Sequence, residues 1–291
     1  MHIAVIGPGA IGCLLAARMQ QADLNVTLVD YREDRAERLN VRGLILEDEK
    51  GRHDIPIRCV SSVPDNTTLQ IVAVKSYATK SLNLSAGCQI LSVQNGLGNI
   101  ETLSDAYGSD LLLCGVTSEA ATLEGEGHVR HAAPGETLIG SWTSADPAQS
   151  LEALRKSGFI AETTESPGQA LWRKVIVNAG INTLTAMVNV PNGRLLEIQE
   201  LRALLRNLVV EAVKVAATEG YRFETSLVEY SEEVCEQTAS NISSMLQDVR
   251  AGRKTEIEAI SGEILRRADL ASLPCPRTRV LYQLLKGLEQ R

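Results

Sequence analysis

The sequence lacks any apolar run long enough to span a membrane, and it lacks a basic N-terminal region followed by a cleavage site. It also lacks an excess of positive charge, because 36 Asp and Glu against 29 Lys and Arg give a net charge of −7. These absences predict no signal peptide, no transmembrane segment, and neither nucleic acid nor an anionic membrane as the main partner.

Disulfide and metal motifs are missing as well. The six cysteines are scattered along the chain without C-x-x-C spacing, which predicts reduced thiols in a cytoplasmic protein. His128 and His131 form an H-x-x-H pair, but the glycines and the proline around them favour a hairpin-like loop, and no further ligand lies nearby in the sequence. We therefore expect no metal site.

The most informative feature that is present lies at the start of the chain. Residues 3–30 predict a strand, a G-x-G-x-x-G turn, a helix, a second strand and an acidic residue at its end. In such a turn the first glycine permits the tight bend, the second lets a pyrophosphate approach the backbone, and the third lets the helix pack against the strand. The residues expected to bind the cofactor here are Gly7, Gly9, Ala10, Ile11 and Gly12. The alternative is a structural turn without a ligand.

The second predicted strand is followed by two residues, Asp30 and Arg32, that favour different cofactors. Asp30 could accept hydrogen bonds from an adenosine ribose, which favours NAD(H) because a carboxylate repels a 2′-phosphate. Arg32 could bind that phosphate and favour NADP(H), or it could be a solvated surface charge.

The first half of the chain alternates short apolar runs with helical stretches, which predicts a mostly parallel sheet covered by helices. The strand-like runs are Ile3–Ile6, Val26–Val29, Ile71–Val74, Ile90–Val93, Leu111–Val116 and Leu138–Ile139. Residues 44–57 and 127–140 look like irregular or antiparallel additions.

The pattern changes near Ser166, where a Ser-Pro-Gly sequence interrupts it. From there the chain reads as almost wholly helical, with helices expected over 169–187, 199–219, 227–236 and from 244 to the end. We therefore predict a nucleotide-binding domain over 1–166 and an all-α domain over 167–291. The helical part could supply a homodimer interface or simply a core.

Polar residues follow two of the predicted strands. Lys75 comes after the strand ending at Val74, and Asn95 follows the strand ending at Val93. If these strands are parallel, both residues lie at the sheet edge that carries the glycine turn. A solvated lysine and a plain Asn-Gly turn are the alternatives.

A polar stripe interrupts a strongly apolar helical segment. Lys174, Asn178 and Asn182 are spaced by four residues, so they share one helix face. Buried polar groups need partners, which a polar substrate or a polar network among the helices would supply. The spacing favours the substrate.

A helix start is predicted at Thr255, because Thr255-x-x-Glu258 has the form of a capping box and Gly252 breaks the preceding helix. Glu256 would then lie in the first turn, where the helix dipole stabilises a carboxylate. It could bind a substrate hydroxyl or pair with a lysine, or it could serve the helix alone.

Together these motifs resemble the ketopantoate reductase family across nearly the whole chain. The resemblance rests on the glycine turn, Val74-Lys75, Gln94-Asn95-Gly96, the Trp172–Asn182 segment and the Ser243–Ile257 segment. It implies a Rossmann-type domain with a mostly parallel α/β sheet, followed by an all-helical domain, with the active site between them.

The resemblance also implies roles for individual residues. Lys174 would be the catalytic lysine and Glu256 the acid near it. Asn95, Asn178, Asn182 and Ser244 would bind substrate, while Lys75 and Asn95 would lie near the cofactor and Arg32 would read its 2′-phosphate. The implied reaction is reduction of 2-dehydropantoate to (R)-pantoate with NAD(P)H. A reductase of another 2-oxo acid, or a non-catalytic nucleotide-sensing protein, are the alternatives.

Overall fold

The computed structural model describes residues 1–290, which form two compact units. The first unit contains residues 1–94 and 99–168, and the second begins at Gln169 but also includes Asn95–Gly98. The change at residue 168 lies close to the division expected at Ser166. The assignment of Asn95–Gly98 to the helical unit has no counterpart in the sequence pattern.

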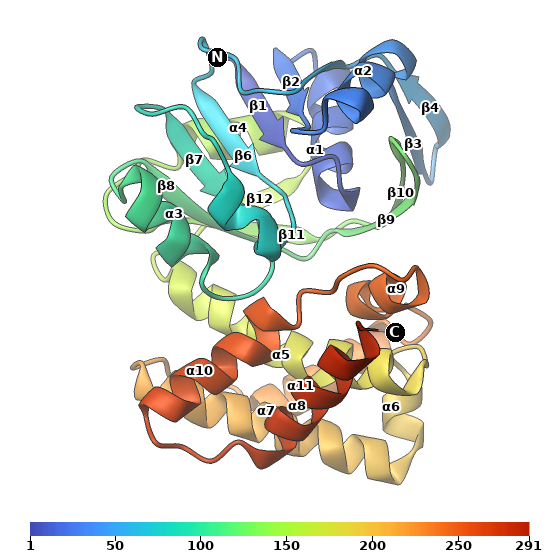
Figure 1. Cartoon of the computed structure of the whole chain (residues 1–291), viewed down its shortest axis with the longest axis vertical. Coiled ribbons are helices and arrows are strands. Elements are labelled where there is room, and N and C mark those ends of the chain that lie inside the picture. The colour runs from blue at the N-terminus through green and yellow to red at the C-terminus, as the bar shows by residue number, and fades with distance from the viewer. Residues whose placement is uncertain (291) are drawn as a thin grey trace. The chain divides into compact units, whose positions relative to one another are not determined.

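An eight-stranded sheet forms the centre of the first unit (Figure 1). Its strands are β1 (Ile3–Ile6), β2 (Val26–Val29), β5 (Arg58–Val60), β6 (Leu69–Val72), β7 (Gln89–Ser92), β8 (Leu112–Thr117), β11 (Glu136–Ser141) and β12 (Ile160–Thr163). Their spatial order is β12-β11-β8-β7-β6-β1-β2-β5, and every neighbouring pair is parallel except β8 and β11. The mostly parallel sheet is thus confirmed. The first two strands match their predicted limits, whereas β6 and β7 end one or two residues early because the apolar runs continue beyond the paired residues.

A smaller four-stranded sheet accounts for the two segments expected to be irregular or antiparallel. Its strands are β3 (Leu44–Asp48), β4 (Gly51–Ile55), β9 (Ala120–Gly125) and β10 (His128–Ala133), in the order β4-β3-β10-β9. The β3–β4 and β9–β10 pairs are antiparallel, and β10 joins β3 in parallel. The segment 127–140 is therefore divided, because its first half pairs in the small sheet and its second half forms β11.

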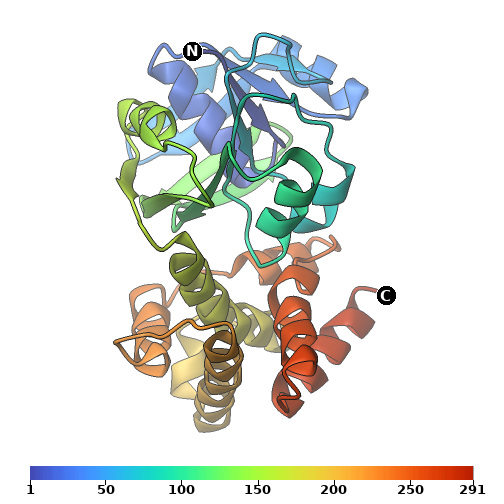
Figure 2. The same cartoon turned by 90° about the vertical axis from the view of Figure 1, so that its left-hand side faces the viewer.

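Helices cover both faces of the large sheet. They are α1 (Ala10–Gln21), α2 (Glu33–Arg42), η1 (Ser76–Ser81), α3 (Asn99–Tyr107) and α4 (Ala148–Lys156). Figure 2 shows α1 and α4 on one face, with η1 and α3 on the other. All four residues of β1 are buried, as a central parallel strand covered on both faces requires. The core on the α1 side combines β1, α1, α4 and the small sheet, with Val5, Leu14, Leu46, Val129 and Leu154 among its members.

The second unit is helical, and α5 lies among its other helices (Figures 1 and 2). Its elements are α5 (Pro167–Val188), α6 (Arg194–Glu197), α7 (Gln199–Thr218), α8 (Leu227–Gln237), α9 (Ser244–Arg250), the π-helical turn η2 (Glu258–Gly262), α10 (Glu263–Leu270) and α11 (Pro276–Leu288). The first three predicted helices match α5, α7 and α8 closely. Beyond Ser244, the break predicted at Gly252 lies within an interruption at 251–257, whereas a second interruption at 271–275 was not predicted. In residues 1–290, no helix combines the length and the apolar character that crossing a bilayer requires.

Close packing around α5 explains its apolar composition. A Cβ added at Gly180 would lie 2.7 Å from Leu205 Cδ1, so the glycine lets α5 and α7 approach each other. Leu205, Leu208 and Val209 form the buried face of α7, as the helical spacing of its leucines predicts.

Candidate active site

The glycine turn between β1 and α1 is tightly packed on one side and open on the other. Gly7 has φ +104°, and a Cβ there would lie 2.6 Å from Val74 Cγ1. At Gly12 a Cβ would lie 1.9 Å from the Gly7 carbonyl oxygen, so helix and strand meet only because glycine is present. At Gly9 a Cβ would meet no atom within 4 Å. This open approach to the backbone, at the N-terminus of α1, fits a pyrophosphate group.

The strand ends next to this turn come from parallel neighbours, as predicted. Strands β7, β6, β1 and β2 lie side by side, so their carboxyl ends share one edge of the sheet. Lys75 lies just beyond β6 and caps the N-terminus of η1. The side-chain amide of Gln94 donates to the Val74 carbonyl over 3.0 Å and to Thr79 Oγ1 over 2.8 Å, which fixes the ends of β6 and β7 relative to each other.

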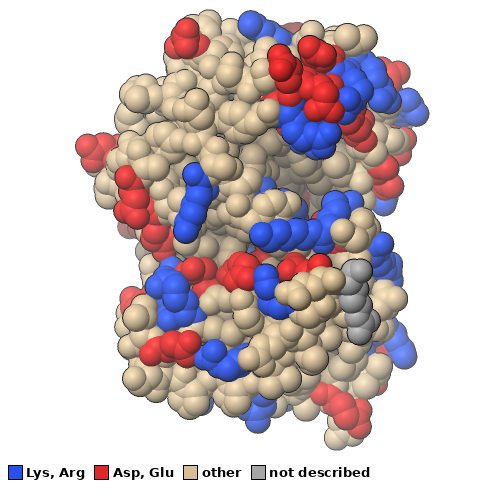
Figure 3. Space-filling model, viewed as in Figure 1, with Lys and Arg blue, Asp and Glu red and all other residues tan. Residues whose placement is uncertain are grey.

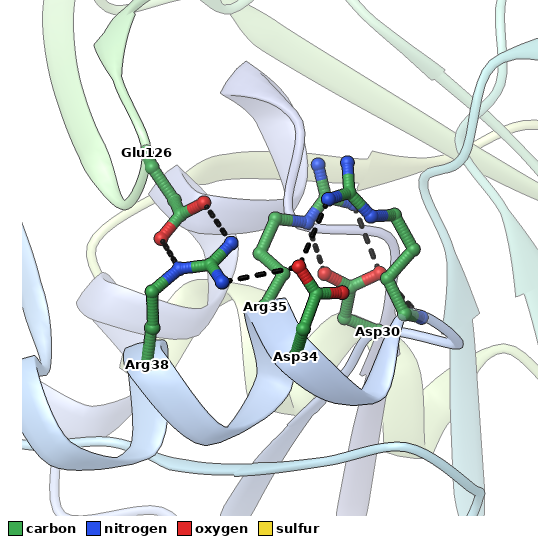
Figure 4. A network of polar contacts seen from close by, with 6 residues as sticks. Asp30, Asp34, Arg35, Arg38 and Glu126 are labelled. Atoms are coloured by element: carbon green, nitrogen blue, oxygen red, sulfur yellow. Dashed lines mark hydrogen bonds and ion pairs between the residues drawn. The ribbon is translucent and has the colours of Figure 1, made fainter.

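Asp30, at the end of β2, is buried and already paired (Figure 4). The Arg35 guanidinium donates to both carboxylate oxygens, through Nε to one and through Nη2 to the other over 2.9 Å. The Arg32 backbone N–H donates to Asp30 Oδ1 over 3.2 Å, whereas the Arg32 side chain is 62% exposed and pairs with Asp34 over 3.1 Å. Sequence reasoning missed Arg35. The signal that could have found it is an arginine in the first turn of the helix that follows the acid.

The polar stripe on α5 is present as the spacing predicts. Lys174 and Asn178 are half-buried, and Asn182 is only 8% exposed. Between them Val175 and Ile176 are fully buried. A cation and two carboxamides therefore interrupt a helix most of whose residues are buried.

Two hydroxyl contacts tie α5 to the segments that carry the other predicted residues. Thr185 Oγ1 lies 2.7 Å from Ser243 Oγ, and Thr183 Oγ1 lies 3.3 Å from Ser261 Oγ in η2. Ser243 is the N-cap of α9, since its hydroxyl accepts the Leu246 N–H over 3.2 Å. Ser244, the first residue of α9, is exposed, and its hydroxyl is not the one that caps the helix.

Glu256 meets a residue from a distant part of the chain. The Asn95 side-chain amide donates to Glu256 Oε2 over 3.4 Å, although 161 positions separate the two residues. Next to it, the Leu97 N–H donates to the Ala259 carbonyl over 2.7 Å. Gly96 has φ +88°, and a Cβ there would lie 2.5 Å from the Ala259 Cβ. The Asn95–Gly98 segment thus docks on residues 256–259 and holds the Asn95 amide near a carboxylate that is 6% exposed.

The capping box predicted at Thr255 does not form. The Thr255 hydroxyl accepts the Ile257 N–H over 3.2 Å and donates to the Glu289 carboxylate over 2.6 Å, and the Thr255 N–H donates to the same oxygen over 2.7 Å. Glu258 bonds instead to Lys286 and Tyr282 of α11, over 2.7 and 2.8 Å. Long-range carboxylate bonds therefore replace the local cap. They hold the backbone on either side of Glu256 against the last helix.

The charge on Glu258 follows from these contacts. Burial acts to raise the pKa of Glu258, but the hydrogen bonds from Lys286 and Tyr282 outweigh burial and lower that pKa. The hydrogen bond to Glu258 in turn raises the pKa of Lys286. Glu258 and Lys286 are therefore both ionised at neutral pH. Their ion pair holds the backbone at Glu258 against α11 without a change of protonation near pH 7.

The two histidines of the H-x-x-H pair each lie next to an acidic side chain. Both histidines lie on β10 of the β9–β10 hairpin, where His128 pairs with Glu47 over 2.9 Å and His131 with Glu119 over 2.6 Å. No group of three or more metal-ligating side chains occurs within residues 1–290. None of the six cysteines forms a disulfide within residues 1–290, and burial raises the pKa of Cys13 to about 12.

The sheet is mostly parallel, the backbone of the glycine turn is open to a ligand, and the helical unit carries a partly buried lysine–asparagine stripe. These features define a two-unit dinucleotide-binding protein. Comparison with known proteins identifies the particular kind. Residues 3–144 match the family "Ketopantoate reductase PanE/ApbA", and residues 168–289 match its C-terminal family. The chain belongs to the ketopantoate reductase family.

Individual relatives cover the chain from end to end. A 2-dehydropantoate 2-reductase from Halobacterium salinarum is 36% identical over 100% of this chain and 99% of its own length. The crystal structure of a PanE/ApbA family ketopantoate reductase from Ralstonia eutropha JMP134 has a TM-score of 0.90 at 29% identity, covering 100% of this chain and 99% of that one. A D-mandelate dehydrogenase with NADH and anilino(oxo)acetate shares the fold, with a TM-score of 0.92 at 23% identity over 100% and 98% of the two chains.

Proposed function

We propose that this protein reduces 2-dehydropantoate to (R)-pantoate with NAD(P)H, a step toward pantothenate and coenzyme A. The observation that carries the proposal is the set of polar groups gathered in the helical unit. Lys174, Asn178 and Asn182 share one face of α5, and Asn95 meets Glu256 beside the turn η2. Relatives that span the full length and are named for this activity support the same reaction.

The roles in the reaction follow from the chemistry of these side chains. When bound, the nicotinamide supplies a hydride to the C2 carbonyl carbon of the substrate. The Lys174 ammonium stabilises the negative charge that develops on the carbonyl oxygen and donates the proton that completes the hydroxyl. Asn178, Asn182 and Ser244 bind the substrate carboxylate and hydroxyl and hold them in register.

Glu256 would accept a hydrogen bond from a substrate hydroxyl or pair with the catalytic lysine. One of its contacts is the hydrogen bond from the neutral amide of Asn95 over 3.4 Å. Asn95 would contact both substrate and nicotinamide.

The residues that would hold the dinucleotide lie on the first unit. Gly7, Gly9 and the first residues of α1, Ala10, Ile11 and Gly12, would bind the pyrophosphate, and Lys75 would lie beside the cofactor. We favour NADPH, with Arg32 at the 2′-phosphate. NADH stays open because of Asp30.

The direct test is Lys174→Ala, with Lys214→Ala as a control because Lys214 is an exposed lysine of α7. We expect the variant at Lys174 to lose about 10²- to 10⁴-fold in kcat with 2-dehydropantoate, as removal of a general acid does. The binding constant of the nucleotide should not change. Equal turnover by the Lys174 variant and the wild type would remove Lys174 from this role.

The identity of the substrate is tested by comparing turnover across a panel of 2-oxo acids. A clear preference for another acid would select the related reductase, and nucleotide binding without turnover of any 2-oxo acid would select the sensing protein. A homodimer and a cytoplasmic location stay predictions, to be checked by light scattering and by cell fractionation.

A further inference from the structure

The acidic residue at the end of β2 is fully paired within the protein. Both oxygens of Asp30 accept hydrogen bonds from Arg35, and one also accepts the Arg32 N–H. The Asp30 side chain is 5% exposed, and that of Arg35 is 29% exposed. These three hydrogen bonds take up most of the roughly four acceptor sites of a carboxylate, and the bidentate guanidinium cancels its charge.

The surroundings of this pair are electrically balanced. Arg38 pairs with Glu126 over 2.8 Å through two nitrogens and with Asp34 over 3.0 Å (Figure 4). Hydrogen bonds from Arg32 and Arg38 lower the pKa of Asp34, and those from Arg38 lower the pKa of Glu126, so both of these acids are ionised at neutral pH. On the face shown in Figure 3, acidic and basic side chains gather together over α2. Asp30 therefore adds no uncompensated negative charge to this region.

An acid at this position normally selects NADH for two reasons. It accepts hydrogen bonds from the ribose hydroxyls, and it repels a 2′-phosphate. The hydrogen bonds to the ribose need free carboxylate oxygens, and the repulsion of the 2′-phosphate needs an uncompensated negative charge. Arg35 removes both from Asp30, so the effect of this acid on cofactor choice depends on whether Arg35 is present.

Arg32 is held much more loosely. Its guanidinium is 62% exposed, and its partner Asp34 is 57% exposed. An exposed ion pair of this kind contributes little free energy, so a phosphate dianion can replace Asp34 at low cost. A neutralised Asp30 and an available Arg32 together suit a 2′-phosphate.

We propose that the Asp30–Arg35 ion pair determines nucleotide selectivity, with Arg35 as a positioning residue that neutralises Asp30 and so admits NADPH. The inference rests on the proposed function only in that a nicotinamide dinucleotide binds at the glycine turn. It places the selectivity in a pair of residues, where the sequence pattern pointed to Asp30 and Arg32 separately.

The experiment measures the Kd of NADPH and of NADH for the intact protein without substrate, by fluorescence titration and calorimetry. Arg35→Gln should weaken NADPH about tenfold relative to NADH, because it leaves the Asp30 charge uncompensated. Asp30→Asn should strengthen NADPH binding relative to NADH binding, because it leaves the positive charge of Arg35 uncompensated. Arg38→Gln is the matched control, since Arg38 lies on the same helix but does not contact Asp30, and it should change the ratio less than about twofold.

The double variant Asp30→Asn/Arg35→Gln separates action through Asp30 from direct contact of Arg35 with the phosphate. If the two charges act by cancelling each other, the double variant removes both and returns the Kd ratio to within about twofold of the wild-type ratio. A double variant that binds NADPH as weakly, relative to NADH, as Arg35→Gln alone would overturn the proposal, as would equal effects of Arg35→Gln on both nucleotides.

Folding and function are controlled separately. Each variant is checked by its thermal unfolding midpoint, and Asp30→Asn alone carries the test if Arg35→Gln does not fold: an unchanged Kd ratio would then overturn the proposal. Because Kd is measured without substrate, nucleotide binding with no turnover of 2-dehydropantoate would count against the proposed function and not against this inference.

Discussion

Two buried carboxylates, Asp30 in the sheet unit and Glu256 in the helical unit, are held in contrasting ways. Asp30 is 4% exposed and Glu256 is 6% exposed. Asp30 accepts hydrogen bonds from the cation Arg35, five residues along the chain, whereas Glu256 accepts one from the neutral amide of Asn95, 161 residues away. An arginine cancels the charge of the carboxylate that it binds, whereas an amide donor does not. The first arrangement suits selection among ligands by charge, and the second suits contact with a polar substrate.

The contrast extends to what holds each site together. The Asp30 pair depends on one turn of helix, so its disruption should change binding more than geometry. The Glu256 site depends on backbone docking between segments far apart in sequence, so small steric changes there should have large effects. Three predictions test this difference.

The largest effect is expected from Gly96→Ala. The new Cβ would lie 2.5 Å from the Ala259 Cβ and 2.6 Å from its carbonyl oxygen, at a φ of +88°. The segment must move, which takes the Asn95 amide away from Glu256. We expect kcat/KM to fall by about 10²-fold, the loss associated with a displacement of about 1 Å at a reacting site.

Gly252→Ala is the matched control, because Gly252 also has a positive φ, +61°, but a Cβ there meets no atom within 4 Å. Gly252→Ala therefore introduces the backbone strain of an alanine at positive φ without a steric clash. Similar activity losses in both variants would contradict the docking role of Gly96 and attribute the effect to backbone strain alone.

An intermediate effect is expected from Thr255→Val. The hydroxyl that donates to Glu289 is lost, which should lower the free energy of unfolding by about 1–3 kcal/mol because a buried acceptor loses a partner. Since Thr255 is next to Glu256, kcat should also fall several-fold. Thr255→Ser should restore both quantities.

Thr278→Val provides the comparison for this variant. Thr278 is buried and donates its N–H and its hydroxyl to Glu211 over 2.9 and 2.7 Å, the same pair of bonds that Thr255 makes. We expect a similar loss of stability but an unchanged kcat. If kcat fell equally in both variants, the clamp at Thr255 would be structural only.

The smallest effect concerns a third carboxylate, Glu232, which resembles Asp30 in being held by arginines. Hydrogen bonds from Arg202 and Arg206 lower the pKa of Glu232 from its ordinary value of 4.5 to about 2. The unfolded chain therefore binds a proton before the native protein does, so the stability from this group is present above pH 4.5 and is lost as the pH falls toward about 2. In acid titrations followed by circular dichroism, Glu232→Gln should flatten this part of the stability curve. An unchanged curve would rule out the arginine pair as the cause.

Local patterns were enough to predict the sheet unit and the helices, because strand periodicity and the glycine turn depend on neighbouring residues. The same holds for the stripe on α5, which needs only a spacing of four. The helix start at Thr255 was predicted wrongly, because the Thr255 N–H donates to Glu289 in place of Glu258, whose carboxylate binds Tyr282 and Lys286. The docking of Asn95–Gly98 on Ala259 and the pairing of Asp30 with Arg35 escaped prediction because spacing alone does not show which distant or flanking groups meet.

The assignment of Asn95–Gly98 to the helical unit has a practical meaning for building hybrids between family members. A crossover near residue 167 would combine this four-residue segment from one parent with an acceptor surface at Ala259 from another. Any parent with a side chain larger than alanine at that position would exclude the incoming glycine loop. Functional chimaeras should therefore take residues 95–98 and the surface around residue 259 from the same parent, although the two segments are far apart in the gene.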